Sequence, residues 1–249
     1  MVEVIGMNEM IDAVRGIVRD SNNVVILSGL KLMQESGLKG VREDEQILEV
    51  ETRFGYTPDE ILTTEFLMRR VDMFYEFYRE YILDFEHMHP TSAHYAMAGL
   101  EQQGKLSAVI TRTVMGLHQM AGVHNVIELY GNVQINKCTK CGREYPIHYI
   151  AEKKPVPRCE HCGIPLKPGM ALFGERLDNG RMSQSIDKVS HADVLILAGT
   201  SPKSYMSRWL LPYYEGEKLI LIMPEPDKAD ERANYKLYGK CMDILPKIV

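Results

Sequence analysis

Hydrophobic positions recur along the chain in two patterns that predict helices and buried strands. From Met7 to Arg19 the apolar residues fall at roughly helical intervals, and the polar run Ser21-Asn22-Asn23 then ends the predicted helix. Continuous apolar runs typical of buried strands follow at 24–27, 108–111, 193–197 and 219–222. Apolar strands that alternate with helices predict an α/β fold with a Rossmann-like parallel sheet covered on both faces.

The ends of these strands predict where a ligand binds. In a parallel sheet of this kind, ligands bind outside the carboxyl ends of the strands. Three of the predicted strands run into polar or glycine-containing segments, namely Ser28-Gly29, Thr111-Arg112-Thr113 and Gly199-Thr200-Ser201. We therefore expect these segments to converge on one crevice.

An insertion at about 40–89 separates the first two predicted strands. Its aromatic stretch, Phe66 to Tyr81, places Phe74, Phe77-Tyr78 and Tyr81 at spacings of three and four, which predicts an amphipathic helix. Such aromatics most often face the core of a small helical module, and we favour that interpretation over a groove for a cofactor or an acyl chain.

Four cysteines carry the strongest motif in the chain. Cys138 and Cys141 form one CxxC pair, Cys159 and Cys162 form a second, and seventeen residues separate the pairs. This spacing predicts a zinc site, and four thiolate ligands close a tetrahedral site with no open position for water. We therefore expect a structural rather than a catalytic zinc ion, with four free or redox-active thiols as the alternative.

The two insertions predict a division of the chain. We expect a Rossmann-like nucleotide-binding lobe made of residues 1–39, 90–135 and 171–249. A smaller lobe is expected to combine a helical insertion at 40–89 with a zinc-ribbon module at 136–170.

Composition and charge exclude several classes of protein. The 249 residues are 45% hydrophobic and 25% charged, as in ordinary globular domains, and the formal net charge of −5 argues against nucleic acid as a partner. The first twenty residues contain four acidic side chains, and no apolar run approaches the length of a membrane span. We expect a cytoplasmic protein, in which the fifth cysteine, Cys241, is a small buried residue.

Together the strand-end segments resemble the sirtuins, the NAD-dependent protein-lysine deacylases, over nearly the whole chain. The matches begin with a Ser-Gly turn and an ESG segment, and end with a terminal LPK segment. In order, they are Leu27-Ser28-Gly29, Glu35-Ser36-Gly37 with Arg42, Pro90 with Ala93-His94, Gly116-Leu117-His118 with Ala121-Gly122, Glu128-Leu129-Tyr130-Gly131, Phe173-Gly174-Glu175, Gly199-Thr200-Ser201 and Leu245-Pro246-Lys247.

The resemblance implies a nucleotide ligand, NAD or ADP-ribose, and an acylated protein or peptide as the other partner. By position in the motifs, the residues implied for the nucleotide are Gly29, Lys31, Glu35, Arg42, Arg112, Thr113, Thr200 and Ser201. The resemblance also implies that the peptide adds as a strand between Phe173-Gly174-Glu175 and the loop that follows Ser201. Pro202 in that loop lacks a backbone donor, which disfavours the second half of this pairing.

The residues that carry the chemistry depart from the family pattern. The resemblance places a general-base histidine where this chain has Tyr130, and the family's QNID segment is Arg112-Thr113-Val114-Met115 here. As residue types, histidine titrates near ~6.5 and tyrosine near ~10, and general-base catalysis is typically worth ~10²- to 10⁴-fold. Arg112 adds a positive charge where the family's reaction develops a cation, which opposes that transition state.

The phosphate loop is changed as well, because Leu30-Lys31 replaces small residues. Their side chains occupy space that a pyrophosphate would need, although Lys31 can instead pair with a phosphate.

Three functions remain open from the sequence. The first is a sirtuin-like protein that is catalytically impaired and retains at most nucleotide or peptide binding. The second is an active deacylase with a rearranged site, in which His118 or His124 could replace the missing base. The third, the least supported, is an ADP-ribosyltransferase.

Overall fold

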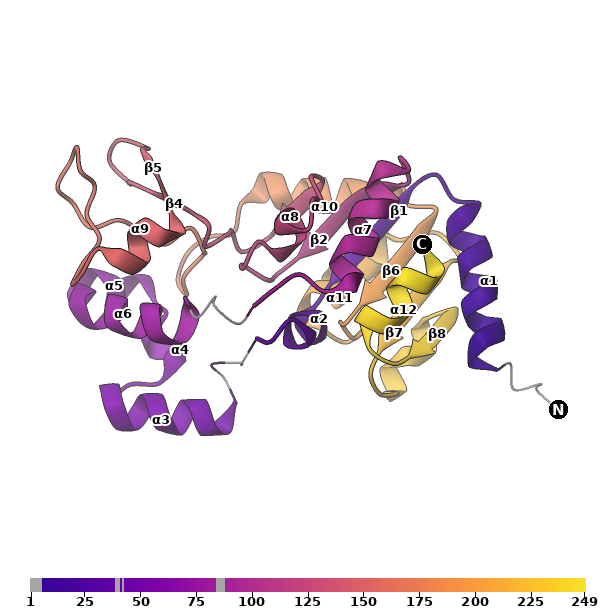
Figure 1. Ribbon diagram of the computed structural model, residues 1–249, viewed down its shortest axis with the longest axis horizontal. Coiled ribbons are helices and arrows are strands. Elements are labelled where there is room, and N and C mark those ends of the chain that lie inside the picture. Colours follow the sequence, from indigo (N-terminus) through magenta and orange to yellow (C-terminus); the bar gives the residue numbers. More distant parts are fainter. Residues whose placement is uncertain (1–5, 39–40, 42, 84–87) are drawn as a thin grey trace. The chain divides into compact units, whose positions relative to one another are not determined.

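The chain forms an α/β structure with a parallel sheet and a separate set of helices and short strands. A computed structural model describes residues 6–38, 41, 43–83 and 88–249 (Figure 1). Within those residues no helix combines the length and the apolar character that crossing a membrane would require.

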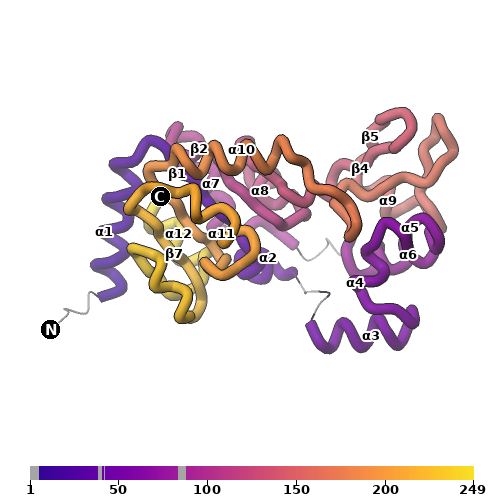
Figure 2. The backbone as a smooth tube through the Cα atoms, turned by 180° about the vertical axis from the view of Figure 1, so that it is seen from behind, coloured from indigo at the N-terminus to yellow at the C-terminus, as the bar shows by residue number. Residues whose placement is uncertain are grey.

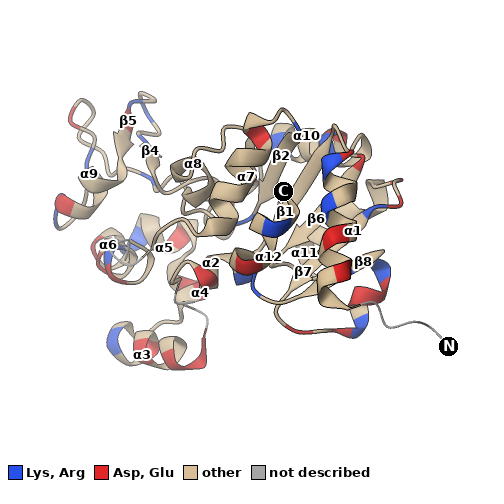
Figure 3. Cartoon of the chain, turned by 45° about the vertical axis from the view of Figure 1, so that its right-hand side comes forward, with Lys and Arg blue, Asp and Glu red and all other residues tan. Residues whose placement is uncertain are grey.

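The described chain divides into two compact units. Unit 1 comprises Met1–Ser36, His89–Leu129 and Asp178–Val249, and unit 2 comprises Gly37–Met88 and Tyr130–Leu177. Unit 2 therefore contains both insertions that the sequence indicates. Acidic and basic side chains both occur on α1 (Met7–Arg19), whereas α3 (Asp44–Phe54) is mainly acidic with one arginine in its last turn (Figure 3).

Unit 1 is built on a six-stranded sheet with the order β3-β2-β1-β6-β7-β8, in which every neighbouring pair is parallel. The predicted α/β class and the four predicted strands are confirmed. The strand bounds are β1 Val24–Ser28, β2 Leu106–Thr111, β3 Val126–Glu128, β6 Val194–Ala198, β7 Leu219–Met223 and β8 Tyr235–Tyr238. Every residue of β1 and β6 is buried, because helices cover both faces.

Helices pack on the two faces of this sheet. On one face α12 packs against α1, α2 and α7, and α7 against α8; on the other, α10 packs against α11 (Figure 1). The predicted helix at Met7–Arg19 is confirmed as α1, whose Ile11, Val14 and Val18 are buried. The remaining bounds are α2 Leu30–Glu35, α7 Ser92–Gln102, α8 Leu117–Met120, α10 Asn179–Ser190, α11 Tyr205–Leu210, η2 Leu211–Tyr213, η3 Lys228–Arg232 and α12 Cys241–Ile248.

The helical part of unit 2 has an aromatic core. Phe74, Phe77 and Tyr78 are fully buried, which confirms the expectation that these aromatics form the core of a small module. Phe74 stacks on Tyr78 at a centroid distance of 5.7 Å, and the Tyr75 hydroxyl donates to the Leu166 carbonyl. Besides α3, the helices are α4 Pro58–Ile61, α5 Thr64–Arg69, α6 Val71–Phe77 and the π-helical turn η1 Tyr78–Ile82.

A small ribbon completes unit 2. Strands β4 (Ile135–Lys137) and β5 (Glu144–Pro146) pair antiparallel, and α9 (Ile147–Glu152) packs beside them (Figure 2). The ribbon is joined to the helical part through the Arg79 guanidinium, which donates to the carbonyls of Ile150, Lys153 and Pro155.

Candidate functional site

The carboxyl ends of β1 and β6 form the point where the strand order of unit 1 reverses, which is where α/β sheets bind ligands. The Gly29 N–H donates to the Ala198 carbonyl at 2.9 Å, and the Lys31 N–H donates to the Gly199 carbonyl at 3.1 Å. A Cβ on Gly29 would overlap the Gly199 carbonyl oxygen and Thr200 Cβ, and Gly199 has φ +65°. Only glycines allow the two loops to approach this closely.

Hydroxyl groups surround this edge. The Thr111 hydroxyl donates to the Ser28 carbonyl at 3.2 Å and lies 2.7 Å from the Thr113 hydroxyl. On the β6 side the Thr200 hydroxyl donates to Ser204 Oγ at 3.0 Å, and the Ser204 N–H donates to the Ser201 carbonyl. The predicted convergence of the three strand-end segments is therefore confirmed.

Two cations that the sequence indicated belong to this edge. The Lys31 side chain is exposed and has no ion-pair partner in the part of the chain that the structure describes. The Arg112 guanidinium lies over the Tyr205 ring, 5.4 Å from its centroid. Lys31 lies in the first turn of α2, and its expected contact with a phosphate stays a prediction, whereas the Arg112 guanidinium lies over an aromatic face.

Glu35 has a structural role in unit 1. Its two carboxylate oxygens accept the N–H groups of Cys241 and Met242, each at 2.8 Å, at the first turn of α12. A carboxylate at this position satisfies donors that otherwise lack a partner and interacts favourably with the helix dipole. Its expected contact with the nucleotide stays a prediction.

Two buried histidines lie near Ser28, the last residue of β1. His118 Nε2 is 3.0 Å from Ser28 Oγ, and the His118 ring centroid lies 4.8 Å from that of His94. The Thr91 N–H donates to His94 Nδ1 at 3.1 Å. Burial lowers the pKa of His118 to about 3 and that of His94 to about 4, so both rings are neutral near pH 7.

Neither alternative histidine is placed as an exposed base at the edge of the sheet. His118 is only 1% exposed. The His124 side chain is exposed, and its N–H and ring nitrogen both contact Glu101 Oε2, at 2.8 and 3.1 Å.

The remaining predicted residues lie elsewhere. Tyr130 is half-buried at the start of the second segment of unit 2, where its carbonyl accepts the Ala171 N–H at 2.8 Å. Arg42 lies outside the described residues, so its expected contact with the nucleotide stays a prediction.

The segment implied in peptide binding is anchored within unit 2. The Phe173 N–H donates to the Leu62 carbonyl at 2.9 Å, and the Thr64 N–H donates to the Phe173 carbonyl at 3.1 Å. These bonds form a parallel bridge between Thr63 and Phe173. Among the described residues, neither backbone group of the next residue, Gly174, bonds to another residue. Gly174 can therefore pair with an added strand on its free side.

The four predicted cysteines come together in unit 2. Two tight turns of the same kind hold them: the Gly142 N–H donates to the Cys138 carbonyl, and the Gly163 N–H donates to the Cys159 carbonyl. Both glycines have positive φ, +71° and +69°, which lets each turn close around its cysteine pair.

This arrangement fits a zinc ion. All four Sγ atoms lie within 4.8 Å of one another, and Cys141 Sγ is 3.7 Å from Cys159 Sγ. Zn–S bonds of about 2.3 Å in a tetrahedron require sulfur atoms about 3.8 Å apart. The Tyr145 hydroxyl and the Cys162 N–H both donate to Cys159 Sγ, which orients that ligand.

The edge of unit 1 also fits a nucleotide. Its loops turn at Gly29 and Gly199, and its threonine and serine hydroxyls and Lys31 suit phosphate and ribose oxygens. Gly29, Thr113, Thr200, Ser201 and Lys31 would hold it. When bound, NAD would supply an activated ribose carbon that accepts an acyl oxygen.

Sequence reasoning missed the Ser28-His118-His94 cluster and the capping role of Glu35. His94 and His118 stand in matched motifs, but nothing in their spacing indicates that helices α7 and α8 bring the two rings together. The partners of Glu35 lie more than 200 positions away in the chain, so no local pattern could indicate them.

Comparisons with known proteins agree with this architecture. The sequence profile of the Sir2 family matches residues 32–205. An NAD-dependent protein deacetylase of Clostridium acetobutylicum is 33% identical over 97% of this chain and 98% of its own length. One from Clostridium perfringens is 35% identical over 98% of this chain and its full length.

Solved structures of Sir2 proteins have the same fold. A Sir2 homologue in complex with NAD has a TM-score of 0.81, with 28% identity over 95% of this chain and 91% of that one. A Sir2 protein with a histidine-to-tyrosine exchange, solved with a p53 peptide and NAD, has a TM-score of 0.77, with 27% identity over 98% of this chain and 97% of that one. The family match and the full-length relatives establish that this chain belongs to the Sir2 family.

Proposed function

We propose that this Sir2-family chain binds NAD or ADP-ribose and an acylated peptide, and that it deacylates far more slowly than family members with the usual motifs. The observation that carries the proposal is the joint replacement of the residues that the family resemblance assigns to the chemistry, while Gly29, Thr200, Ser201 and the Phe173-Gly174-Glu175 segment match the family pattern. Tyr130, Arg112 and Met115 stand at the altered positions. We further propose that the protein works in the cytoplasm.

The binding half of the proposal rests on the sheet edge of unit 1 and on Gly174 in unit 2. The glycines and hydroxyls at the ends of β1, β2 and β6 suit a nucleotide. In the related Sir2 protein with a histidine-to-tyrosine exchange, NAD and a peptide are bound together. In that protein the tyrosine is therefore compatible with the binding of both ligands.

The catalytic half rests on chemistry. A protonated phenol is a poor general base near pH 7, and the loss of such a base typically costs ~10²- to 10⁴-fold in rate. A guanidinium at Arg112 opposes positive charge that develops in a transition state nearby. Neither His118 nor His124 replaces the missing general base. His118 is buried and contacts the Ser28 hydroxyl, and His124 contacts Glu101.

The second candidate is an active deacylase, which the names of the clostridial relatives favour. The decisive experiment compares the wild-type protein with Tyr130→His and with a variant that also carries Arg112→Gln, Thr113→Asn and Met115→Asp. NAD and ADP-ribose binding is measured by calorimetry, and nicotinamide release is measured with and without an acetyl-lysine peptide.

We expect wild-type protein to bind the nucleotide with little nicotinamide release, and the combined variant to release it at least ~10²-fold faster. The Arg208→Gln variant, which changes an exposed arginine on α11, serves as a control and should behave like wild type. Rapid peptide-dependent release by the wild-type protein would establish the second candidate instead. A protein that binds no nucleotide would contradict both.

A further inference from the structure

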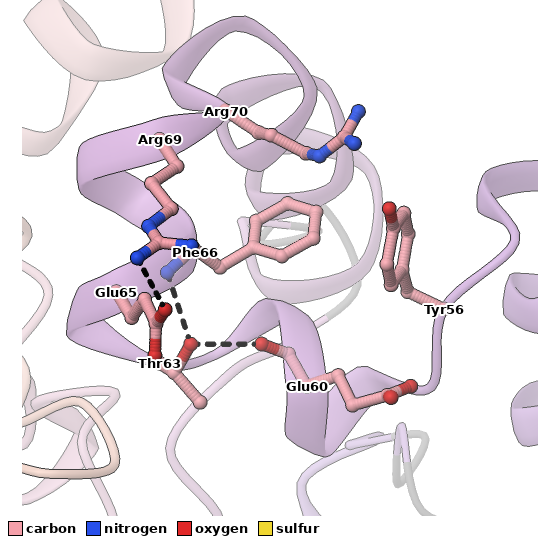
Figure 4. Close-up of a pocket in the computed structure, with 7 residues that line it drawn as sticks. All are labelled: Tyr56, Glu60, Thr63, Glu65, Phe66, Arg69 and Arg70. Atoms are coloured by element: carbon pink, nitrogen blue, oxygen red, sulfur yellow. Dashed lines mark hydrogen bonds and ion pairs between the residues drawn. The ribbon is translucent and has the colours of Figure 1, made fainter.

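A surface pocket of about 650 Å³ lies wholly within the helical part of unit 2 (Figure 4). Its walls come from the residue Tyr56 before α4, from α4 itself, from the turn between α4 and α5, and from α5 with its C-cap residue Arg70. The Arg70 guanidinium, the Phe66 ring and the Tyr56 ring are turned toward one another in it, and we call this the Arg70 pocket. None of its residues is among those implied for the nucleotide, the acyl-lysine or zinc.

The charged side chains that line the Arg70 pocket differ in whether they have a partner. Arg69 pairs with Glu65 at 3.1 Å. The Glu60 carboxylate accepts the Thr57 N–H at 2.7 Å and the Thr57 hydroxyl at 2.9 Å, which hold its pKa below the ordinary value. Arg70 alone has no carboxylate partner among the residues that the structure describes.

Aromatic side chains orient the Arg70 guanidinium. Its carbon lies 5.4 Å from the centroid of the Tyr56 ring, and the Tyr56 ring meets the Phe66 ring edge-on at 5.0 Å. Phe66 is only 8% exposed, so the aromatic pair is anchored in the core. A guanidinium stacked on an aromatic face keeps its N–H edge available, and that edge matches a carboxylate with two parallel hydrogen bonds.

The Arg70 pocket is tied to the segment proposed to bind the peptide. Thr63 lines the pocket and also forms the parallel bridge with Phe173. A strand added beside Gly174 would lie two strand spacings, about 10 Å, from Thr63. A glutamate side chain that extends from such a strand toward Thr63 would therefore approach the wall of the pocket that Thr63 forms.

We infer that the Arg70 pocket is a specificity subsite that takes an acidic side chain of the peptide, at a position flanking the acyl-lysine. This inference rests on the proposed peptide binding and adds the sequence class of the peptide. An Arg–carboxylate pair in a surface pocket selects peptides with an acidic residue over peptides with a neutral one, without contributing to the chemical step.

The test uses short peptides with a central acetyl-lysine between alanines, in which one glutamate, or one glutamine as a neutral match, is placed at each flanking position in turn. Affinities for the zinc-loaded protein are measured by calorimetry in the presence of ADP-ribose. The variants are Arg70→Gln and Tyr56→Leu, and Arg232→Gln removes an exposed arginine of unit 1 as the control. Thermal unfolding verifies that each variant is folded.

For one flanking position we expect the glutamate peptide to bind about three- to tenfold tighter than its glutamine match. Arg70→Gln should remove this difference and leave the affinity for the all-alanine peptide unchanged, and Tyr56→Leu should reduce the difference. Equal affinity for glutamate and glutamine peptides at every position would overturn the subsite while leaving the proposed function intact. If no acetyl-lysine peptide binds, both proposals are overturned.

Discussion

Ser28, His94 and His118 make up a buried polar cluster whose titration should govern the acid stability of unit 1. His118 Nδ1 and His94 Nε2 have no hydrogen-bond partner among the described residues, so protonation of either ring would place a charge in the core. Burial, with a smaller contribution from the neighbouring His94, holds the pKa of His118 at about 3. The rings are therefore tolerated in the neutral form only.

The sign of the pH effect follows from linkage. In the unfolded chain both rings titrate near ~6.5, whereas in the folded protein they titrate near 3 and 4. The unfolded state binds more protons below pH ~6.5, so the free energy of unfolding falls as the pH drops through that value toward 4. Each ring contributes a slope of at most about 1.4 kcal/mol per pH unit.

Urea unfolding at several pH values between 7.5 and 4.5 measures this slope. We expect His118→Gln to be less stable at pH 7.5 but to lose stability less steeply on acidification. His148→Gln, which changes an exposed histidine, controls for general effects. The comparison is made between variants because acid also protonates zinc thiolates. Parallel slopes for the wild-type protein and His118→Gln would rule out this origin.

Among the elements, α12 depends on a residue of α2. Glu35→Ala removes the carboxylate that accepts the N–H groups of Cys241 and Met242, so we expect a loss of about 1–2 kcal/mol in the free energy of unfolding. Glu215→Ala, at an exposed position between η2 and β7, should cost far less. Urea unfolding compares the two variants.

The same variant separates two roles for Glu35. If the residue acts as a cap, Glu35→Ala lowers stability and leaves the dissociation constant for ADP-ribose unchanged. A weaker affinity for ADP-ribose with unchanged stability would instead support the nucleotide contact that the family resemblance implies.

Elements with a strong local pattern could be predicted from the sequence. Continuous apolar runs identified β1, β2, β6 and β7, and helical periodicity identified α1, because each pattern lies within the element itself. Strands β3 and β8 were missed. Each is short, with only three or four residues, and its burial depends on neighbours rather than on an apolar run of its own.

Those parts of the candidate site that belong to recognisable sequence motifs could be predicted. The cysteine cluster and the convergence of the strand-end segments followed from spacing and sheet topology. The Arg70 pocket was not predicted, because Tyr56 lies before α4 and no pattern in the sequence indicates that it packs against Phe66 of α5 and Arg70 at the end of that helix.

At the scale of the whole molecule, zinc should stabilise unit 2 selectively. The ribbon has only two short strands, and its cysteine turns are joined through the metal site. Structural zinc sites of this kind contribute folding free energy directly. Chelation should therefore increase hydrogen exchange in residues 135–167, while the strands of unit 1 keep their protection.

Metal analysis and hydrogen exchange test this expectation. We expect one zinc ion per chain in the wild-type protein and in Cys241→Ala, whose cysteine is buried in unit 1, and less in Cys159→Ser. If chelation leaves hydrogen exchange in the ribbon unchanged, the folded ribbon does not depend on the metal.

The division of the chain into alternating segments has a consequence for its synthesis. The polypeptide passes four times from one unit to the other, so no single cut releases either unit intact. β1 lies between β2 and β6, and β6 begins only at Val194, long after β1 has left the ribosome. Until then one edge of a strand with four consecutive apolar residues, Val24 to Leu27, stays unpaired, which makes the nascent chain prone to aggregation and a natural client for chaperones.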